Sequence, residues 1–128
     1  MIVARFPDPI PLVRAHLLAA LPGTPVVSRV PNPRPEKFVQ LMHTGGSRAT
    51  LAHQDSHVTV LCWATDSVAA FNLAADAYAA LDDAELATGA YVPRGDDDGF
   101  VGGIARLDDL DTGTPRYQFT AVVRCRAL

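Results

Sequence analysis

The chain has 128 residues, of which 48% are hydrophobic, and a formal net charge of −3. This length fits a single domain over residues 1–128, with enough apolar side chains for a core that needs no metal or disulfide. Acidic residues concentrate between Asp96 and Asp111, so the composition gives no electrostatic footprint for gripping nucleic acid.

The sequence carries no recognisable signal for membranes or export. No apolar run approaches the roughly 20 residues that span a bilayer, and the N-terminus lacks the basic region and apolar block of a signal peptide. Cys62 and Cys125 lie on the apolar faces of predicted strands, which favours buried free thiols over a disulfide or a ligand pair. We therefore expect a soluble protein made in the cytoplasm, without a membrane partner.

The first predicted element is a helix that begins at Asp8-Pro9 and ends at about Leu21. Aspartate is a good N-cap, and proline suits the first helical position because no amide donor is missed there. Pro22-Gly23 then stops the helix. The predicted buried stripe consists of Ile10, Val13, Leu17, Ala20 and Leu21.

Two strands are predicted around a stiff connection. Residues 24–30 favour a strand centred on Val26 and Val27, and the prolines within residues 31–35 hold the next segment extended. Residues 37–44 alternate as a second strand.

A long polar loop is predicted after this strand. Gly45-Gly46 is expected to break the strand, and residues 45–55 combine weak periodicity with several polar side chains. We therefore predict a long hairpin loop, with or without strand-like arms, that returns into the next strand at His57. A loop of this length in a small domain usually has a function.

The clearest pattern in the chain is a strand that leads into a helix. Residues 57–63 alternate with a period of two, and after Ala64 the apolar positions recur every three or four residues. Seven alanines between Ala69 and Ala80 make the helix slim, which favours close approach to a sheet or a neighbouring subunit. Its predicted buried stripe comprises Val68, Phe71, Ala75, Tyr78 and Leu81, and its N-cap is Thr65, Asp66 or Ser67.

The C-terminal part of the chain favours further strands. Residues 88–93 favour a short strand, residues 94–99 an acidic turn, and residues 100–107 a strand weakened by Gly102-Gly103. Residues 116–126 alternate most cleanly. The core-facing set is Tyr117, Phe119, Ala121, Val123 and Cys125. These elements predict an α+β fold, with an antiparallel sheet of about four to five strands and two helices packed on it.

No residue pattern indicates catalysis, a metal or a cofactor. His53 and His57 straddle a loop and a strand start, so their rings would not face each other. The acidic turn lacks the spaced ligands of a calcium loop. Ser56 and His57 would point to opposite faces of a strand, which is poor geometry for a nucleophile and its base. We predict that the chain is not an enzyme and needs no cofactor.

Several short motifs resemble the tail terminator proteins of long-tailed bacteriophages and their prophage relatives. They are spread over most of the chain and include no catalytic signature. The motifs are Pro33-Arg34-Pro35 before Phe38 and Val39, the turn at Thr44-Gly45-Gly46, Cys62-Trp63-Ala64 before the alanine-rich helix, and Pro115-Arg116-Tyr117.

The resemblance implies a homohexameric ring that caps the finished tail tube, stops its polymerisation and offers the surface to which the head connector docks. The implied partners are other copies of the chain, the major tail tube protein and the head connector or neck protein, with DNA only as passing cargo. The implied location is the head-proximal end of the virion tail, after assembly in the host cytoplasm. An acidic protein without basic stripes suits a lumen that does not hold DNA.

Two other functions stay open. One is another assembly factor of the head–tail joint, such as a tail-completion or neck protein. The other is a small-molecule enzyme or binding domain, which would need an enclosed pocket with convergent polar groups.

Two groups of residues are predicted to make contacts in such an assembly. The polar loop is expected to dock on the tube through Arg48, Thr50, His53, Gln54 and Asp55. Like subunits are expected to meet through the alanine-rich helix, the apolar N-terminus, and Arg34, Arg124 and Arg126. The acidic turn around Asp97 matches no feature of the family.

Overall fold

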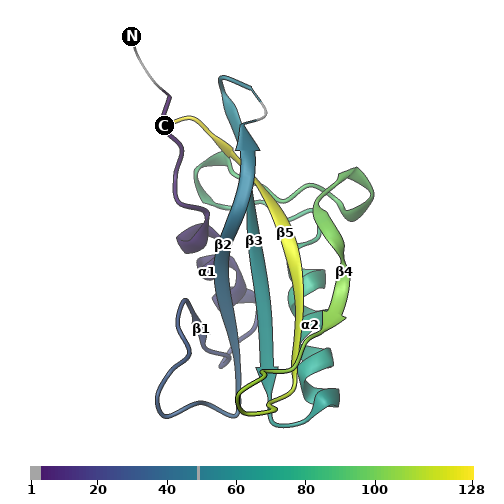
Figure 1. Ribbon diagram of the computed structural model, residues 1–128. Helices are drawn as coiled ribbons and strands as arrows, with labels where there is room; N and C mark the ends of the chain where they lie inside the picture. The colour runs from purple at the N-terminus through teal and green to yellow at the C-terminus, as the bar shows by residue number, and fades with distance from the viewer. Residues whose placement is uncertain (1–3, 49) are drawn as a thin grey trace.

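The computed structural model describes residues 4–48 and 50–128, which form one five-stranded sheet in the order β1-β2-β3-β5-β4 (Figure 1). β1 runs parallel to β2, and the other neighbouring pairs are antiparallel. The strands are β1 (Val26–Val27), β2 (Lys37–Arg48), β3 (His53–Ala64), β4 (Phe100–Arg106) and β5 (Arg116–Arg126). The predicted α+β class is confirmed, with one parallel pair in a mostly antiparallel sheet.

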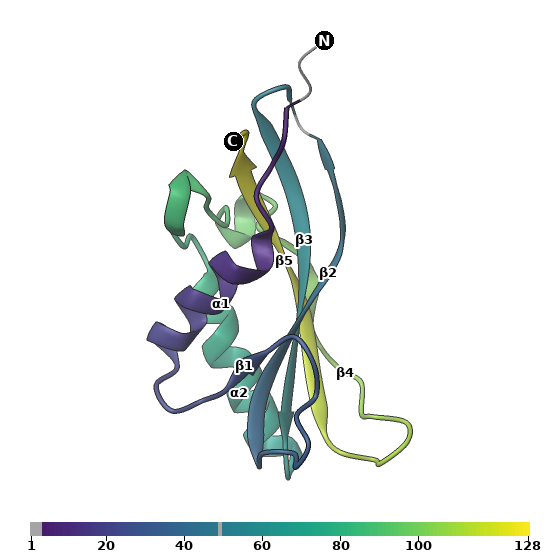
Figure 2. The ribbon, with the colours of Figure 1, turned by 90° about the vertical axis from the view of Figure 1, so that its left-hand side faces the viewer.

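Both helices cover the same face of the sheet (Figure 2). They are α1 (Pro9–Ala20) and α2 (Ser67–Leu81). The main core lies between them and the sheet, and it includes Val13, Leu17, Leu73, Leu81, Val60, Phe119 and Val123. Neither helix is long and apolar enough to cross a membrane, and this holds for the described residues.

α1 forms as the sequence predicts. The Asp8 side chain accepts a hydrogen bond from the Ile10 amide at 3.0 Å, and Pro9 stands at the first helical position. The helix ends at Ala20, one residue before the predicted end. Val13 and Leu17 are fully buried, which confirms the centre of the predicted stripe.

α2 buries a different stripe from the predicted one. Asp66 is the N-cap, because its side chain accepts from the Ala69 amide at 2.8 Å. Of the predicted stripe only Leu81 is fully buried, whereas Val68 is 69% exposed and Phe71 45% exposed. The buried positions are Ala70, Leu73, Ala74, Ala77 and Leu81. The helix turns its small side chains to the sheet because this allows close backbone packing, a gain that outweighs burying the larger ones.

The predicted hairpin is present, but its loop is much shorter than predicted, because residues 45–48 and 53–55 belong to two paired strands. β2 continues through Gly45 and Gly46 to Arg48 with a bulge after His43, and β3 begins at His53 rather than His57. A Cβ on Gly46 would collide with the Asp55 carbonyl oxygen. The glycines therefore permit close strand pairing and a bulge where the sequence indicated a break.

The remaining strands are shorter or less regular than predicted, except β5. The predicted strand over residues 24–30 contains two paired residues, and that over residues 88–93 is reduced to isolated bridges from Tyr91 to Glu85 and to Arg124. Two short 3₁₀ turns, η1 (Ala87–Gly89) and η2 (Gly95–Asp97), occupy the connection from α2 to β4. β5 has the predicted alternation, with Phe119, Ala121, Val123 and Cys125 buried towards the helices.

Candidate functional site

No helix covers the face of the sheet opposite α1 and α2 (Figure 2), although some of its side chains, such as Leu61, are buried. We call it the open face. Its middle has no charged side chain on β2, β3 or β5, and it consists of Gln40, Met42, Thr59, Leu61, Gln118, Thr120 and Val122. The Thr59 hydroxyl is 3.0 Å from that of Thr44 and 2.9 Å from that of Thr120, so three strands are linked by a row of hydroxyls.

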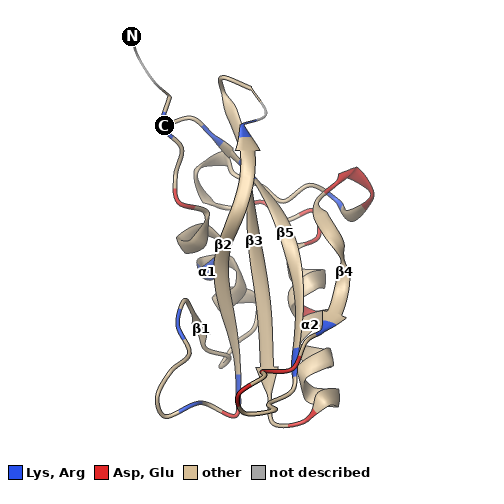
Figure 3. Ribbon diagram, viewed as in Figure 1, with Lys and Arg blue, Asp and Glu red and all other residues tan. Residues whose placement is uncertain are grey.

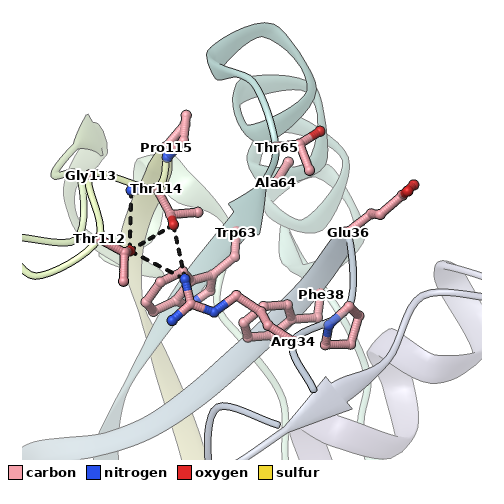
Figure 4. A pocket seen from close by; sticks show the side chains of 11 residues that line it. Arg34, Glu36, Phe38, Trp63, Ala64, Thr65, Thr112, Gly113, Thr114 and Pro115 are labelled. Atoms are coloured by element: carbon pink, nitrogen blue, oxygen red, sulfur yellow. Dashed lines mark hydrogen bonds between the residues drawn. The ribbon is translucent and has the colours of Figure 1, made fainter. Parts of the chain in front are cut away.

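One end of the open face holds an aromatic and cationic cluster beside a hollow of about 420 Å³ (Figure 4). The Phe38 and Trp63 rings stack with centroids 5.3 Å apart. The guanidinium carbons of Arg34 and Arg116 lie 5.0 Å and 4.8 Å from the Trp63 ring centroid. Trp63 is therefore only 3% exposed, although no helix covers this face.

Arg34 ties two connections together across this hollow. Its guanidinium donates to the hydroxyls of Thr112 at 3.2 Å and Thr114 at 2.9 Å, which belong to the connection between β4 and β5. The Thr112 hydroxyl donates in turn to Asp109 at 2.6 Å, and this bond lowers the pKa of the Asp109 carboxyl. Arg34, predicted at a subunit interface, is thus bonded within its own chain.

The other end of the open face holds an ion pair. Arg124 donates two hydrogen bonds to the Asp55 carboxylate, at 2.7 Å and 3.0 Å. The Tyr91 hydroxyl lies 3.4 Å from the same guanidinium. Hydrogen bonding to Arg124 lowers the pKa of Asp55, and the same contact raises the pKa of Arg124. A predicted docking residue and a predicted interface residue therefore neutralise each other.

The other predicted docking residues do not share one loop. Arg48 ends β2, and its guanidinium turns sideways to lie 5.2 Å from the Phe6 ring. The Thr50 hydroxyl accepts from the Ala52 and His53 amides and so shapes the hairpin turn. His53, Gln54 and Asp55 lie within β3. At the turn itself, Leu51 is 83% exposed.

Arg126, the third predicted interface residue, is exposed at the end of β5. It lies beside η1, where a Cβ on Gly89 would stand 3.3 Å from its side chain. The structure therefore places Arg34 at the hollow, and Arg124 and Arg126 two residues apart at the other end of the sheet. Their role at an interface stays a prediction.

Neither cluster of the open face was predicted from the sequence, because both are pairs of residues on neighbouring strands and depend on the strand register. The Asp55–Arg124 pair is a directly opposed cross-strand pair, and opposite charges at such positions are a recognised signal. That signal is readable only when β3 begins at His53. Phe38 and Trp63 are likewise directly opposed, on β2 and β3.

The described residues offer little for catalysis. Residues 4–48 and 50–128 contain no group of three or more His, Cys, Asp or Glu side chains placed to hold a metal ion. Ser56 is fully buried on the helix-covered face, whereas His57 points to the open face. Both cysteines are buried and free, as predicted, and burial raises the pKa of the Cys62 thiol to about 12.

Comparison with known proteins finds a similar fold among solved structures. No protein-family model matches the chain, and no curated protein matches it. Among solved structures, the chain resembles one in the structure titled "Virion of native gene transfer agent (GTA) particle". The TM-score is 0.54 and the identity 22%, over 91% of this chain and 92% of that chain. The likeness shows a shared fold over nearly the whole length of both chains.

Proposed function

We propose that the chain is a structural protein of a phage-type particle and acts as its tail terminator. In this role it forms a homohexameric ring at the head-proximal end of the tail, ends tube polymerisation and offers the surface for head joining. The observation that carries the proposal is the fold shared with a chain of a gene transfer agent virion over nearly the full length. The role requires no enzymatic activity or cofactor, and DNA is only passing cargo.

The motifs that resemble tail terminators support the proposal because they meet in space. Arg34, Trp63 and Arg116 come from three separate motifs, and both guanidinium carbons lie within 5.0 Å of the Trp63 ring centroid. Residues far apart in the chain therefore build one cluster at one end of the open face (Figure 4). A shared cluster is stronger support than scattered short motifs, which also occur by chance.

The turn of the β2–β3 hairpin is the proposed docking element for the tail tube. The hairpin projects beyond the helices at one end of the molecule (Figure 1). Thr50 and Leu51 lie in the turn and His53 directly follows it, and the Leu51 side chain is 83% exposed. Exposed apolar side chains on a projecting turn are suited to docking on another protein. Arg48 and Asp55 are engaged within the chain and take a smaller part.

A second candidate is another factor of the head–tail joint, such as a tail-completion or neck protein. The shared fold with a virion chain supports this candidate as well. The name of that structure refers to the whole virion and does not say which part of the particle the matched chain forms. The two roles differ in partner: a terminator binds the end of the tube, whereas a neck protein binds the connector alone.

The test is deletion and complementation in the phage or prophage that encodes the chain, with electron microscopy of the particles. Loss of the protein should give tails of uncontrolled length without heads, and labelled protein should form one ring at the head-proximal end. Leu51→Ser should weaken length control, whereas Leu110→Ser, its match at a 95% exposed position, should not.

Three outcomes would count against parts of the proposal. Protein along the whole tube or at the tail tip contradicts a terminator. Tails of normal length that fail only to join heads favour the neck candidate. Normal tails with Leu51→Ser contradict docking through the hairpin turn.

A further inference from the structure

The two lateral edges of the sheet belong to segments of opposite charge. Residues 1–48, which include β1 and β2, contain six Lys or Arg and two Asp or Glu. Residues 82–99, which lead into β4, contain one Arg and six Asp or Glu. Because β1 and β4 end the strand order, these segments lie at opposite edges (Figure 3).

The basic edge consists of Arg5, Arg29, Lys37 and Arg48, which are all exposed. None of them takes part in an ion pair within the described part of the chain. The Arg48 guanidinium lies over the Phe6 ring, 5.2 Å from its centroid. β1 pairs only with Val39 and Gln40, so the upper half of β2 leaves its outer edge without a strand partner among the described residues.

The acidic edge consists of Asp82 and Asp83 after α2, together with Asp96, Asp97 and Asp98. The Gly95 amide donates to the Asp82 carboxylate at 2.8 Å, which joins the helix end and the acidic turn into one patch. Arg94, within the acidic turn, is paired with Asp96 at 3.2 Å, and Arg126 lines the same hollow as Asp83. All five carboxylate residues are exposed and leave an excess of negative charge.

Upper β2 and the acidic turn stand at the same height on the sheet. The Val122 amide donates to the Gly99 carbonyl at 2.9 Å, which fixes the end of the acidic turn beside β5. Val122 is in register with His57, and His57 with Gly45 on β2. Arg48 and the aspartates therefore lie on opposite sides of the same end of the molecule.

We infer that the basic edge and the acidic edge bind each other between copies of this chain. Each copy presents both surfaces, so the contact is head-to-tail, and a ring results if the rotation between copies closes. Arg5 and Arg48 lie at the height of the acidic turn, which suits rotation about an axis along the strands. Complementary charge fixes which edges meet and speeds their encounter. The inference deepens the proposed ring and gives the acidic turn a role.

The first test measures association by sedimentation and native mass spectrometry. One variant combines Arg5→Glu and Arg48→Glu, which lie at the same end of the sheet as the acidic turn, so both of its edges are acidic at that end. The other combines Asp96→Lys and Asp97→Lys, so both are basic. Each variant alone should associate about tenfold more weakly than the wild type, and an equimolar mixture should recover wild-type association. Asp111→Lys, on the exposed β4–β5 connection at the opposite end of the sheet from Arg48 and the acidic turn, is the control and should have no effect.

The second test detects the contact even when association is brief. Lys37 is the only lysine in the chain, so Arg48→Lys adds one reactive amine at the basic edge. A carbodiimide should then link residue 48 of one copy to the peptide carrying Asp96, Asp97 and Asp98 of another, in a mixture of isotope-labelled and unlabelled protein. Two results together would overturn the inference. The first is that residue 48 forms no link between copies to the peptide carrying Asp96, Asp97 and Asp98, and the second is that the mixture of variants fails to recover association.

These results are separable from the proposed function. A ring at the tail end with no link between the two edges would leave the terminator role standing and place the subunit contact elsewhere, for example at the exposed Val68 and Phe71 of α2. Links between the two edges in a protein that is absent from tails would support the subunit contact and contradict the terminator role.

Discussion

The two faces of the sheet are held by different kinds of contact. The covered face is built from aliphatic and alanine side chains under α1 and α2, and Leu17, Leu81 and Val123 there are fully buried. The open face has an aromatic stack with two arginines at one end, a row of hydroxyls in the middle and an ion pair at the other end.

This difference indicates which contacts within the chain can be replaced by contacts to a partner. Apolar burial stabilises roughly in proportion to the area removed from water, so the covered face supplies most of the folding free energy. Hydrogen bonds and ion pairs beside water contribute about 1 kcal/mol or less each. The hydroxyls and the ion pair of the open face can therefore give up a contact to a neighbour at small cost to the fold, whereas the buried Phe38 and Trp63 cannot.

The largest contrast between the faces is expected in cysteine reactivity. Only the thiolate reacts with a thiol reagent, and burial on the covered face raises the pKa of Cys62 to about 12. Labelling of Cys62 in the folded protein should be about a thousandfold slower than after denaturation, from the loss of thiolate alone. Cys125, also fully buried, should be slow as well.

A cysteine placed on the open face is the matched control for this measurement. Thr120→Cys lies on the same strand as Cys125 but on the opposite face, and it should label quickly in the folded protein. Rapid labelling of either natural cysteine without unfolding would show that the covered face is open to solvent.

The second contrast is in the cost of truncating an apolar side chain. Leu81→Ala removes a fully buried side chain beneath the sheet and should lower the free energy of unfolding by about 2–5 kcal/mol. Met42→Ala, at a position 46% exposed on the open face, should cost less than about 1 kcal/mol. Urea denaturation measures both. Equal costs would mean that the two faces share the stabilising role.

The smallest effect is expected for the ion pair, and it should depend on pH. Hydrogen bonding to Arg124 lowers the pKa of Asp55 in the folded state, so the pair stabilises the protein above the ordinary carboxyl pKa and loses this effect as pH falls through the folded value. Asp55→Asn should therefore cost about 1 kcal/mol near pH 7 and progressively less below about pH 4.

The same substitution at an exposed turn provides the reference. Asp111→Asn should leave the unfolding free energy unchanged across this range. A cost of Asp55→Asn that stays constant down to about pH 3 would show that the lost contact is not the charged pair.

Local sequence signals predicted most elements of the fold. The Asp8-Pro9 start gave the start of α1, and the alternation of residues 116–126 gave β5 with the correct buried face. The errors arose where packing overrode local pattern. α2 buries Ala70, Ala74 and Ala77 because close approach to the sheet depends on partners that the helix sequence does not contain.

The candidate surfaces were less accessible to sequence reasoning because they depend on strand register. Gly45 and Gly46 suggested a break, which hid the extension of β3 to His53 and so the pairing of Asp55 with Arg124. Arg34 and Arg116 were singled out within separate motifs, but their meeting at Trp63 requires the sheet order. The numbers of charged residues in each segment can be counted from the sequence, whereas the placement of the basic and acidic segments on opposite edges requires the strand order.

Trp63 gives the molecule a built-in optical reporter. It is the only tryptophan in the chain, so the intrinsic indole fluorescence comes from one end of the open face. Its emission depends on Phe38, Arg34 and Arg116, which surround the ring. A partner that displaces Arg34 would alter the spectrum, whereas docking at the hairpin turn would leave it unchanged. One spectroscopic signal therefore distinguishes events at the two ends of the protein without any label.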